Sequence, residues 1–242
     1  MISEIITRAL NDEYLTKENI ATLFDVRLFS DESALIISAG RKKSNQASAA
    51  KAEVHGQLGL NIAPCPGNCK FCSFAAINGI FKESEEISAE EGVQKAINFE
   101  NHRANAIFVM ATAQYPFKKY VEMGREFRRH LKPETVLVSN FGDLTYDMAK
   151  ELKNAGFDGI YHAVRLGEGI DTVFNVENRL KTFINAREAG LQLGTCLEPV
   201  GTEHTTKELV EKTIITRDAK PVFSGAARRI PITGTELEKY SM

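Results

Sequence analysis

The chain has 242 residues, 43% of them hydrophobic and 26% charged, and its formal net charge is −2 at pH 7. The small net charge excludes the broad basic field with which many proteins bind nucleic acid or anionic membranes. No apolar run reaches the roughly 18 residues that a membrane-spanning helix needs, and the first residues lack the basic-then-apolar order of a signal peptide. Three of the four cysteines lie within eight residues of one another. This argues against a disulfide framework, so we expect a cytoplasmic protein with free thiols.

The N-terminal part of the chain carries helical patterns and no strand signal. Thr16 is placed to cap one helix, and Ser30 is placed to cap a second helix that ends at Gly40. We therefore expect a helical extension over residues 1–57 and a larger α/β domain over residues 58–242.

In the larger part, short apolar runs alternate with segments of helical period, which is typical of parallel strands joined by helices. The expected strands are residues 58–63, 106–111, 135–139, 159–164, 191–197 and 221–226. Helix caps are expected at Ser88 with Glu91, Thr145, Asn175 and Thr205 with Glu208, and left-handed helix ends at Gly156 and Gly190. The spacing does not decide between a doubly wound sheet and a barrel or partial barrel. In both, the chemistry belongs at the carboxyl ends of the strands.

A cysteine-rich loop follows the first expected strand. Cys65, Cys69 and Cys72 form a C-x3-C-x2-C pattern with proline and glycine between them. Soft thiolates favour an iron–sulfur cluster, zinc or copper. Structural zinc would need a fourth ligand, which the dispersed histidines do not offer. Three thiolates on a cluster of four irons leave one iron open to a cofactor or substrate.

This spacing, with Phe71 before the last cysteine, resembles the motif of the radical S-adenosylmethionine (SAM) superfamily, and the similarity to its biotin-synthase-like group extends along most of the chain. The resemblance implies a partial (β/α)6 barrel of the TIM type. It also implies a [4Fe–4S] cluster and SAM as cofactors, and an external electron donor such as flavodoxin or ferredoxin. The expected reaction cleaves SAM to a 5′-deoxyadenosyl radical that abstracts hydrogen from a small organic substrate, such as a cofactor precursor or an amino-acid-like molecule.

The resemblance also assigns cofactor contacts. Arg179 matches an arginine that binds the methionine carboxylate of SAM, Phe71 belongs to the cysteine motif, and Ile230 lies in a tail that resembles an adenine-contacting segment. After the second expected strand, many family members carry a glutamate for the methionine amino group. This chain has none there, so Ala111 or Thr112 would have to make that contact.

Charged residues follow the fourth and fifth expected strands. Glu168 lies between two glycines, three residues after Arg165. Both are candidate catalytic residues, Arg165 for a substrate carboxylate and Glu168 for a ribose or amine. Alternation along the fifth strand places Cys196 and Glu198 on one face. If that face is interior, Glu198 is a candidate ligand of substrate or SAM, and Cys196 is a small buried residue, a hydrogen-atom donor or a metal ligand. At most one arginine of the pair at 228–229 can face the site.

The chain departs from biotin synthase at the strand positions where that enzyme holds a second cluster. Here the chain has Val109 and Ser139, and Cys196 is displaced by about two residues from the third position. Sulfur insertion is therefore disfavoured. Two alternatives remain: a metal- or cluster-binding module without SAM cleavage, and a maturation partner that retains the fold. A homodimer or a partner subunit is left open as well.

Overall fold

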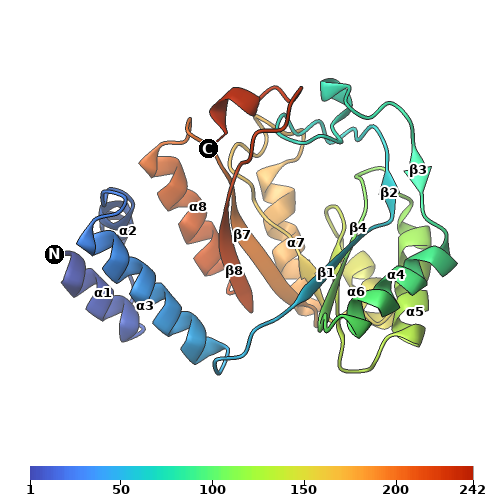
Figure 1. Ribbon diagram of the computed structural model, residues 1–242, viewed down its shortest axis with the longest axis horizontal. Coiled ribbons are helices and arrows are strands. Elements are labelled where there is room, and N and C mark those ends of the chain that lie inside the picture. The colour runs from blue at the N-terminus through green and yellow to red at the C-terminus, as the bar shows by residue number, and fades with distance from the viewer. Residues whose placement is uncertain (242) are drawn as a thin grey trace. The chain divides into compact units, whose positions relative to one another are not determined.

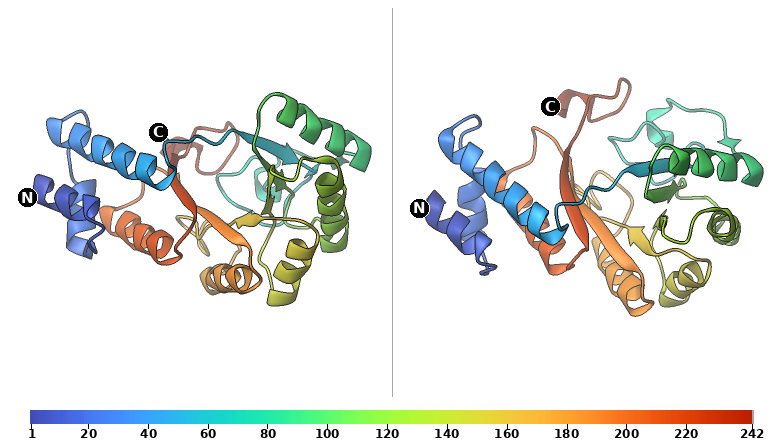
Figure 2. Two further views of the ribbon diagram at one scale, coloured as in Figure 1. Left: turned by 90° about the horizontal axis from the view of Figure 1, so that it is seen from below. Right: turned by 60° about the horizontal axis from the view of Figure 1, so that its bottom comes forward.

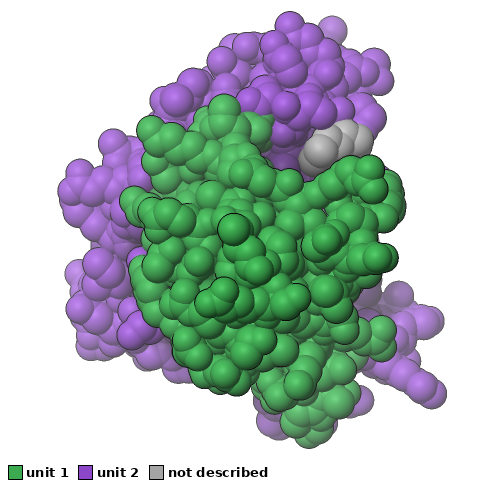
Figure 3. All heavy atoms as spheres, turned by 90° about the vertical axis from the view of Figure 1, so that its left-hand side faces the viewer, with its two compact units in different colours: residues 1–52, 204–215 green, residues 53–203, 216–242 purple. Residues whose placement is uncertain are grey.

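The computed structural model describes residues 1–241. The chain divides into two compact units (Figure 3). Unit 1 comprises Met1–Ala52 and His204–Ile215, and unit 2 comprises Glu53–Glu203 and Thr216–Met242. Among the helices of the described chain, none is both long enough and apolar enough to cross a membrane.

Unit 1 is helical. It contains α1 (Ile2–Leu10), α2 (Lys17–Phe24), α3 (Asp31–Ala47) and most of α8 (Thr206–Asp218). The side chains of Thr16 and Ser30 cap α2 and α3, as predicted. The predicted end of α3 at Gly40 is wrong, because the helix continues to Ala47. Glycine inside a helix costs only about 1 kcal/mol relative to alanine, and the arginine, lysines, glutamine and alanine that follow favour the helix.

Unit 2 is built on a parallel sheet in the order β1-β4-β5-β6-β7-β8 (Figure 1). The strands are β1 (His55–Gly59), β4 (Ala106–Met110), β5 (Val136–Asn140), β6 (Gly159–Tyr161), β7 (Gln192–Val200) and β8 (Phe223–Arg228). A separate antiparallel pair consists of β2 (Asn61–Ile62) and β3 (Glu85–Glu86). The crossover helices on the outer side are α4 (Ala89–Asn101), α5 (Phe117–His130), α6 (Tyr146–Asn154) and α7 (Val176–Glu188) (Figure 2). Two short 3-10 helices are η1 (Ala76–Asn78) and η2 (Glu238–Tyr240).

The sheet curls into a half-barrel. Phe108 of β4 and Phe223 of β8 are not on neighbouring strands, yet their ring centroids lie 6.1 Å apart. Tyr161 of β6 contacts both rings at 6.2 Å. His55 of β1 lies 6.0 Å from Phe223, although these residues belong to the two edge strands. Only a strongly curved sheet brings such side chains together on its concave face, which decides for a partial barrel.

The local signals at the helix ends are mostly confirmed. Asn175 and Thr145 cap α7 and α6, and Thr205 and Glu208 exchange the two hydrogen bonds of a capping box. Ser88 caps α4 by accepting the backbone N–H of Glu91. The glycines after α6 and α7 adopt positive φ values of 97° and 79°.

The first strand starts earlier than predicted. Its bounds are His55–Gly59 instead of residues 58–63, and the chain then turns into the β2 pair. The misplacement arose because His55 and Gln57, which alternate with buried Gly56 and Leu58, do not form an apolar run. The remaining strands lie within three residues of the expected ranges.

Val109 of β4 and Ser139 of β5 were compared above with the strand positions at which biotin synthase holds a second cluster. The structure shows that these two side chains do not face the inside of the half-barrel. The Tyr120 hydroxyl of α5 donates to the Val109 carbonyl oxygen at 2.7 Å and contacts Ser139 Oγ at 3.0 Å. Val109 and Ser139 pair in register, so both side chains point toward the helices and away from the concave face. These positions could not hold a second cluster inside the barrel.

Candidate active site

The cysteine loop is held in shape by its own backbone. The N–H of Cys65 donates to the Phe74 carbonyl at 2.6 Å, and the N–H of Cys72 donates to the Cys69 carbonyl at 2.9 Å. Asn78 Nδ2 donates to the Cys72 carbonyl at 2.9 Å. The loop therefore returns on itself and directs three thiols toward one region.

The three thiols are free, partly buried and close enough to influence one another. Burial raises the pKa of the Cys69 thiol to about 11, while Arg165 lowers it and the thiols of Cys72 and Cys65 raise it further. Burial also raises the pKa of Cys72. A soft metal centre offsets this penalty, because metal binding removes the thiol protons.

The donor set fits a cluster. Within residues 1–241, no three His, Cys, Asp or Glu side chains are spaced as the ligands of one metal ion. A [4Fe–4S] cluster attaches each thiolate to a different iron, so its ligands stand farther apart than those of a single ion. Three thiolates are the donors that an iron–sulfur cluster requires, and Cys65, Cys69 and Cys72 would hold it.

The segment after β4 reaches the cysteine loop. The Ala113 N–H donates to Cys65 Sγ at 3.5 Å. Thr112 is buried, its N–H donates to Asn61 Oδ1 at 3.0 Å, and its hydroxyl accepts Asn61 Nδ2 at 2.7 Å. Ala111 is half-buried beside it. This segment therefore lies beside the cysteine loop, and the Thr112 hydroxyl already has a partner in Asn61.

Glu168 organises the loop after β6. Its side chain is 0% exposed. One carboxylate oxygen accepts the Arg165 N–H at 3.0 Å, and the other accepts the Thr172 hydroxyl at 2.7 Å. Arg179 Nε lies 3.5 Å from the first of these oxygens. These contacts hold the loop and the Arg179 side chain in place, and the expected contact of Glu168 with a ribose or an amine stays a prediction.

Arg179, on α7, lies in a buried charged network. Its Nη1 is 3.1 Å from Asp143 Oδ1 and 3.4 Å from His162 Nε2. Burial raises the pKa of Asp143, but His162 and Arg179 outweigh this and hold it below its usual value. Burial lowers the pKa of His162 to about 4, so the imidazole is neutral at pH 7. Arg179 Nε has no hydrogen-bond partner among residues 1–241.

Phe174 connects Arg179 to the cysteine loop. The Arg179 guanidinium lies 4.1 Å from the Phe174 ring centroid. A Cβ added to Gly67 would lie 2.7 Å from Phe174 Cζ, so only glycine leaves room for this ring. The Val173 N–H donates to the Gly67 carbonyl at 3.3 Å, and the Lys70 N–H donates to the Asp171 carbonyl at 2.9 Å.

The concave face carries a second polar group. Tyr161 pairs in register with Gly194, so Cys196 and Glu198 share the face of the Tyr161 ring, as the alternation predicted. The Tyr161 hydroxyl donates to Glu198 Oε2 at 2.8 Å. Glu198 Oε1 lies 3.7 Å from Arg165 Nε. Burial and the Glu198 charge raise the Tyr161 pKa, so the phenol stays protonated.

The C-terminal segment lies beside the cysteine loop (Figure 1). The Leu237 N–H donates to the Lys70 carbonyl at 3.3 Å, and Lys70 pairs with Glu236 at 3.3 Å. Ile230, a predicted adenine contact, is 60% exposed. Its neighbour Arg229 is buried and donates to Glu203 Oε1 at 2.6 Å. The charge of Arg229 is thus already compensated.

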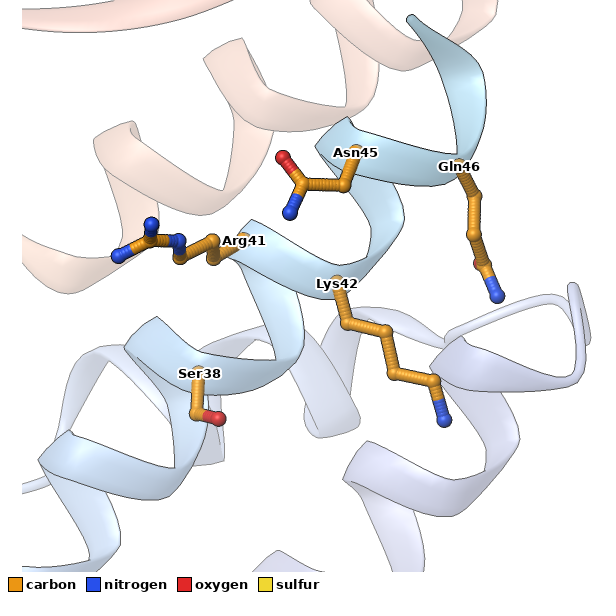
Figure 4. A pocket seen from close by; sticks show the side chains of 5 residues that line it. All are labelled: Ser38, Arg41, Lys42, Asn45 and Gln46. Carbon is orange, nitrogen blue, oxygen red and sulfur yellow. The ribbon is translucent and has the colours of Figure 1, made fainter. Parts of the chain in front are cut away.

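A surface hollow on α3 takes no part in this chemistry (Figure 4). Its lining comes from one helix and contains no cysteine, histidine or carboxylate. The residues are Ser38, Arg41, Lys42, Asn45 and Gln46. All of them are exposed, as expected for the solvated basic face of a helix.

The family model of the radical SAM superfamily matches residues 63–215, which is more than half of the chain. The chain belongs to the radical SAM superfamily. The matched segment begins just before the cysteine loop and includes every strand of the half-barrel from β4 to β7.

The relatives of this radical SAM chain include biotin synthases. It is 27% identical over 190 residues to biotin synthase from Ehrlichia chaffeensis, which covers 75% of this chain and 58% of that enzyme. It is 30% identical over 189 residues to biotin synthase from Thermus thermophilus, covering 74% of this chain and 56% of that enzyme. The chain thus spans little more than half the length of these relatives.

Solved structures show the same fold. HydG, a maturase of the [FeFe]-hydrogenase, superposes with a TM-score of 0.79 over 100% of this chain and 57% of its own, at 18% identity. The half-barrel is therefore the fold of this solved structure as well.

Several residues of the site were not predicted from the sequence. Asp143, His162 and Phe174 surround Arg179, and Tyr161 orients Glu198. Alternation along the short β6 strand was a usable signal for Tyr161. No local pattern marks Asp143 and His162, because they meet Arg179 from other segments, whereas Phe174 directly precedes the cap of the helix that carries Arg179.

Proposed function

We propose that this chain is a radical SAM enzyme in which Cys65, Cys69 and Cys72 hold a [4Fe–4S] cluster. The observation that carries the proposal is the convergence of three partly buried thiols on one loop, with Arg165 acting electrostatically on Cys69. When bound, the reduced cluster and SAM supply a 5′-deoxyadenosyl radical, which takes a hydrogen atom from the substrate.

Around this centre, the protein's own residues bind and orient. Arg179 is the proposed partner of the methionine carboxylate, because its Nε makes no hydrogen bond within the described residues, although Glu168 Oε2 lies 3.5 Å away. Glu168 and Asp143 hold the guanidinium from two sides. The backbone near Ala111 and Thr112 contacts the cysteine loop through Ala113, which supports a cofactor contact there.

We further propose a small organic substrate on the concave face and an external electron donor of the flavodoxin or ferredoxin type. Sulfur insertion at a second cluster is not part of the proposal. Val109 and Ser139 face the helices, and Cys196 is the only cysteine of the sequence outside the loop.

The proposal is tested anaerobically. The protein is reconstituted with iron and sulfide, reduced, and given SAM, and 5′-deoxyadenosine is quantified by chromatography while the paramagnetic spectrum of the cluster is recorded. We expect a reduced [4Fe–4S] signal that shifts on SAM addition and deoxyadenosine that requires both SAM and reductant. A cluster without a spectral shift and without deoxyadenosine would leave only a cluster-binding module.

A further inference from the structure

The ion pair between Arg165 and Glu198 is incomplete. Their closest atoms, Arg165 Nε and Glu198 Oε1, lie 3.7 Å apart, beyond the roughly 2.7–2.9 Å of a charge-assisted hydrogen bond. Within residues 1–241 the Arg165 side chain donates no hydrogen bond at all, although it carries five N–H groups. A structural salt bridge at this depth would be expected to close, since an imperfectly paired charge is costly.

Both side chains of the pair are partly exposed to solvent, and Glu198 is held in place by a hydrogen bond. The Arg165 and Glu198 side chains are 24% and 19% exposed. The Tyr161 hydroxyl occupies Glu198 Oε2, so Oε1 is the oxygen left for a ligand. Glu168 accepts the backbone N–H of Arg165 and thereby holds the start of its loop.

The concave face has open space at two glycines of the edge strands. A Cβ added to Gly225 of β8 would meet only Cys196 Sγ, at 3.9 Å, and one added to Gly59 of β1 would meet no atom within 4 Å. Both glycines share the concave side of their strands with Phe223 and His55. A substrate could therefore extend from the ion pair toward the edge strands, above the aromatic rings.

We propose that Arg165 and Glu198 bind the carboxylate and the ammonium group of a free α-amino acid substrate, a proposal that rests on the radical SAM function above. An α-amino acid carries both charges on one carbon, so it presents opposite charges at the spacing of a single ion pair. It would complete the bidentate contact that Arg165 lacks and donate to Glu198 Oε1. The Arg165 N–H donates to Glu168 Oε2, which lies 3.5 Å from Arg179 Nε, so the α-carbon would lie on the side of the proposed SAM-binding arginine.

Binding is tested separately from turnover. The reconstituted protein is dialysed with SAM against a mixture of uniformly deuterated proteinogenic L-amino acids, and any retained amino acid is identified by mass spectrometry. We expect one amino acid or a few related ones to be retained, and their deuterium to appear in 5′-deoxyadenosine after reduction. Unlabelled deoxyadenosine with no retained amino acid would overturn the inference and leave the radical SAM function standing. Absence of deoxyadenosine would count against the function, whereas retention alone would still support the binding site.

The assignment to this pair is tested with two variants that each remove one charge. Glu198→Gln keeps an acceptor for Tyr161 but loses the charge, and Arg165→Gln removes the cation. Each should weaken amino acid binding at least tenfold, with less than a twofold change in SAM affinity. The deaminated analogue of the retained amino acid should bind the wild type and Glu198→Gln equally. A loss of SAM affinity with unchanged amino acid binding would assign the pair to the cofactor and overturn the inference.

A matched pair of variants on β8 tests whether the substrate occupies the open space next to Gly225. Gly225→Val places a side chain on the concave face, and Ser224→Val places the same side chain on the opposite face of β8. We expect at least a tenfold loss of amino acid binding in the first and none in the second. Equal binding in both would contradict the proposed path of the substrate.

Discussion

The ring of Phe174 lies between the guanidinium of Arg179, 4.1 Å from the ring centroid, and the Cα of Gly67 in the cysteine loop. The proposed SAM-binding arginine and the proposed cluster loop thus share one aromatic neighbour. A displacement of the ring would therefore change the position of both the Arg179 guanidinium and the cysteine loop.

Replacing Phe174 by leucine keeps the apolar volume but removes the aromatic face below Arg179. A cation–π contact at a partly desolvated site contributes about 1 kcal/mol, so we expect SAM affinity to fall roughly fivefold with cluster content unchanged. SAM binding to the reconstituted protein measures this. Phe174→Tyr should retain wild-type affinity, and equal affinity in the leucine variant would show that the ring does not position Arg179.

The cysteines differ in their expected roles, and two serine variants separate them. Cys69→Ser should lose most of the bound iron and sulfide after reconstitution, because one of three thiolate ligands is removed. Cys196→Ser should retain both, since Cys196 lies on β7 beside Gly225. Iron and sulfide analysis is the measurement. A full cluster in Cys69→Ser would exclude the proposed ligand set.

Glu168 is expected to matter for folding stability. Glu168→Ala leaves Arg179 and Thr172 without their buried partner, so the free energy of unfolding should fall by about 3 kcal/mol. Glu168→Gln keeps acceptor and donor atoms and should cost less. Urea unfolding of the cluster-free protein measures both. Glu177→Ala, which removes a carboxylate that is 74% exposed, should change stability by less than about 0.5 kcal/mol. A similar effect of Glu168→Ala and Glu177→Ala would contradict the buried role.

The buried His162 should make the free energy of unfolding depend on pH. Burial lowers its pKa from 6.5 to about 4 in the folded protein. The unfolded chain therefore binds the proton first as the pH falls below 6.5, and stability is lost between pH 6.5 and 4. From pH 7 to pH 5 the loss is roughly 2 kcal/mol for this group.

The control for this prediction is His162→Gln, which cannot take up a proton. Urea unfolding at both pH values should show a smaller pH dependence in the variant by about that amount. An unchanged pH dependence would mean that His162 is already accessible to protons in the folded state.

The cysteine ligands, the helix caps and the strand faces could be predicted from the sequence, because each depends on residues that lie close together in the chain. The three cysteines lie on one loop, and the caps at Thr16, Asn175 and Thr205 bond within three residues. Strand alternation likewise predicted that Cys196 and Glu198 share a face. The family assignment followed from the cysteine motif, because its chemistry depends on spacing along a short segment.

The tertiary structure decided what depends on distant residues. The alternation of strands and helices fits a flat or a curved sheet, and contacts across the concave face, such as those of Phe223 with Phe108 and His55, distinguish them. Likewise, Arg179 could be recognised as a cation by itself, but Asp143 and His162 reach it from other segments once the half-barrel has closed. The sequence by itself determined the ligands and the alternation of strands, through hydrogen bonds and spacings of a few residues. The curvature of the sheet determined the barrel and the partners of each charge, because burial brings together groups that no local pattern connects.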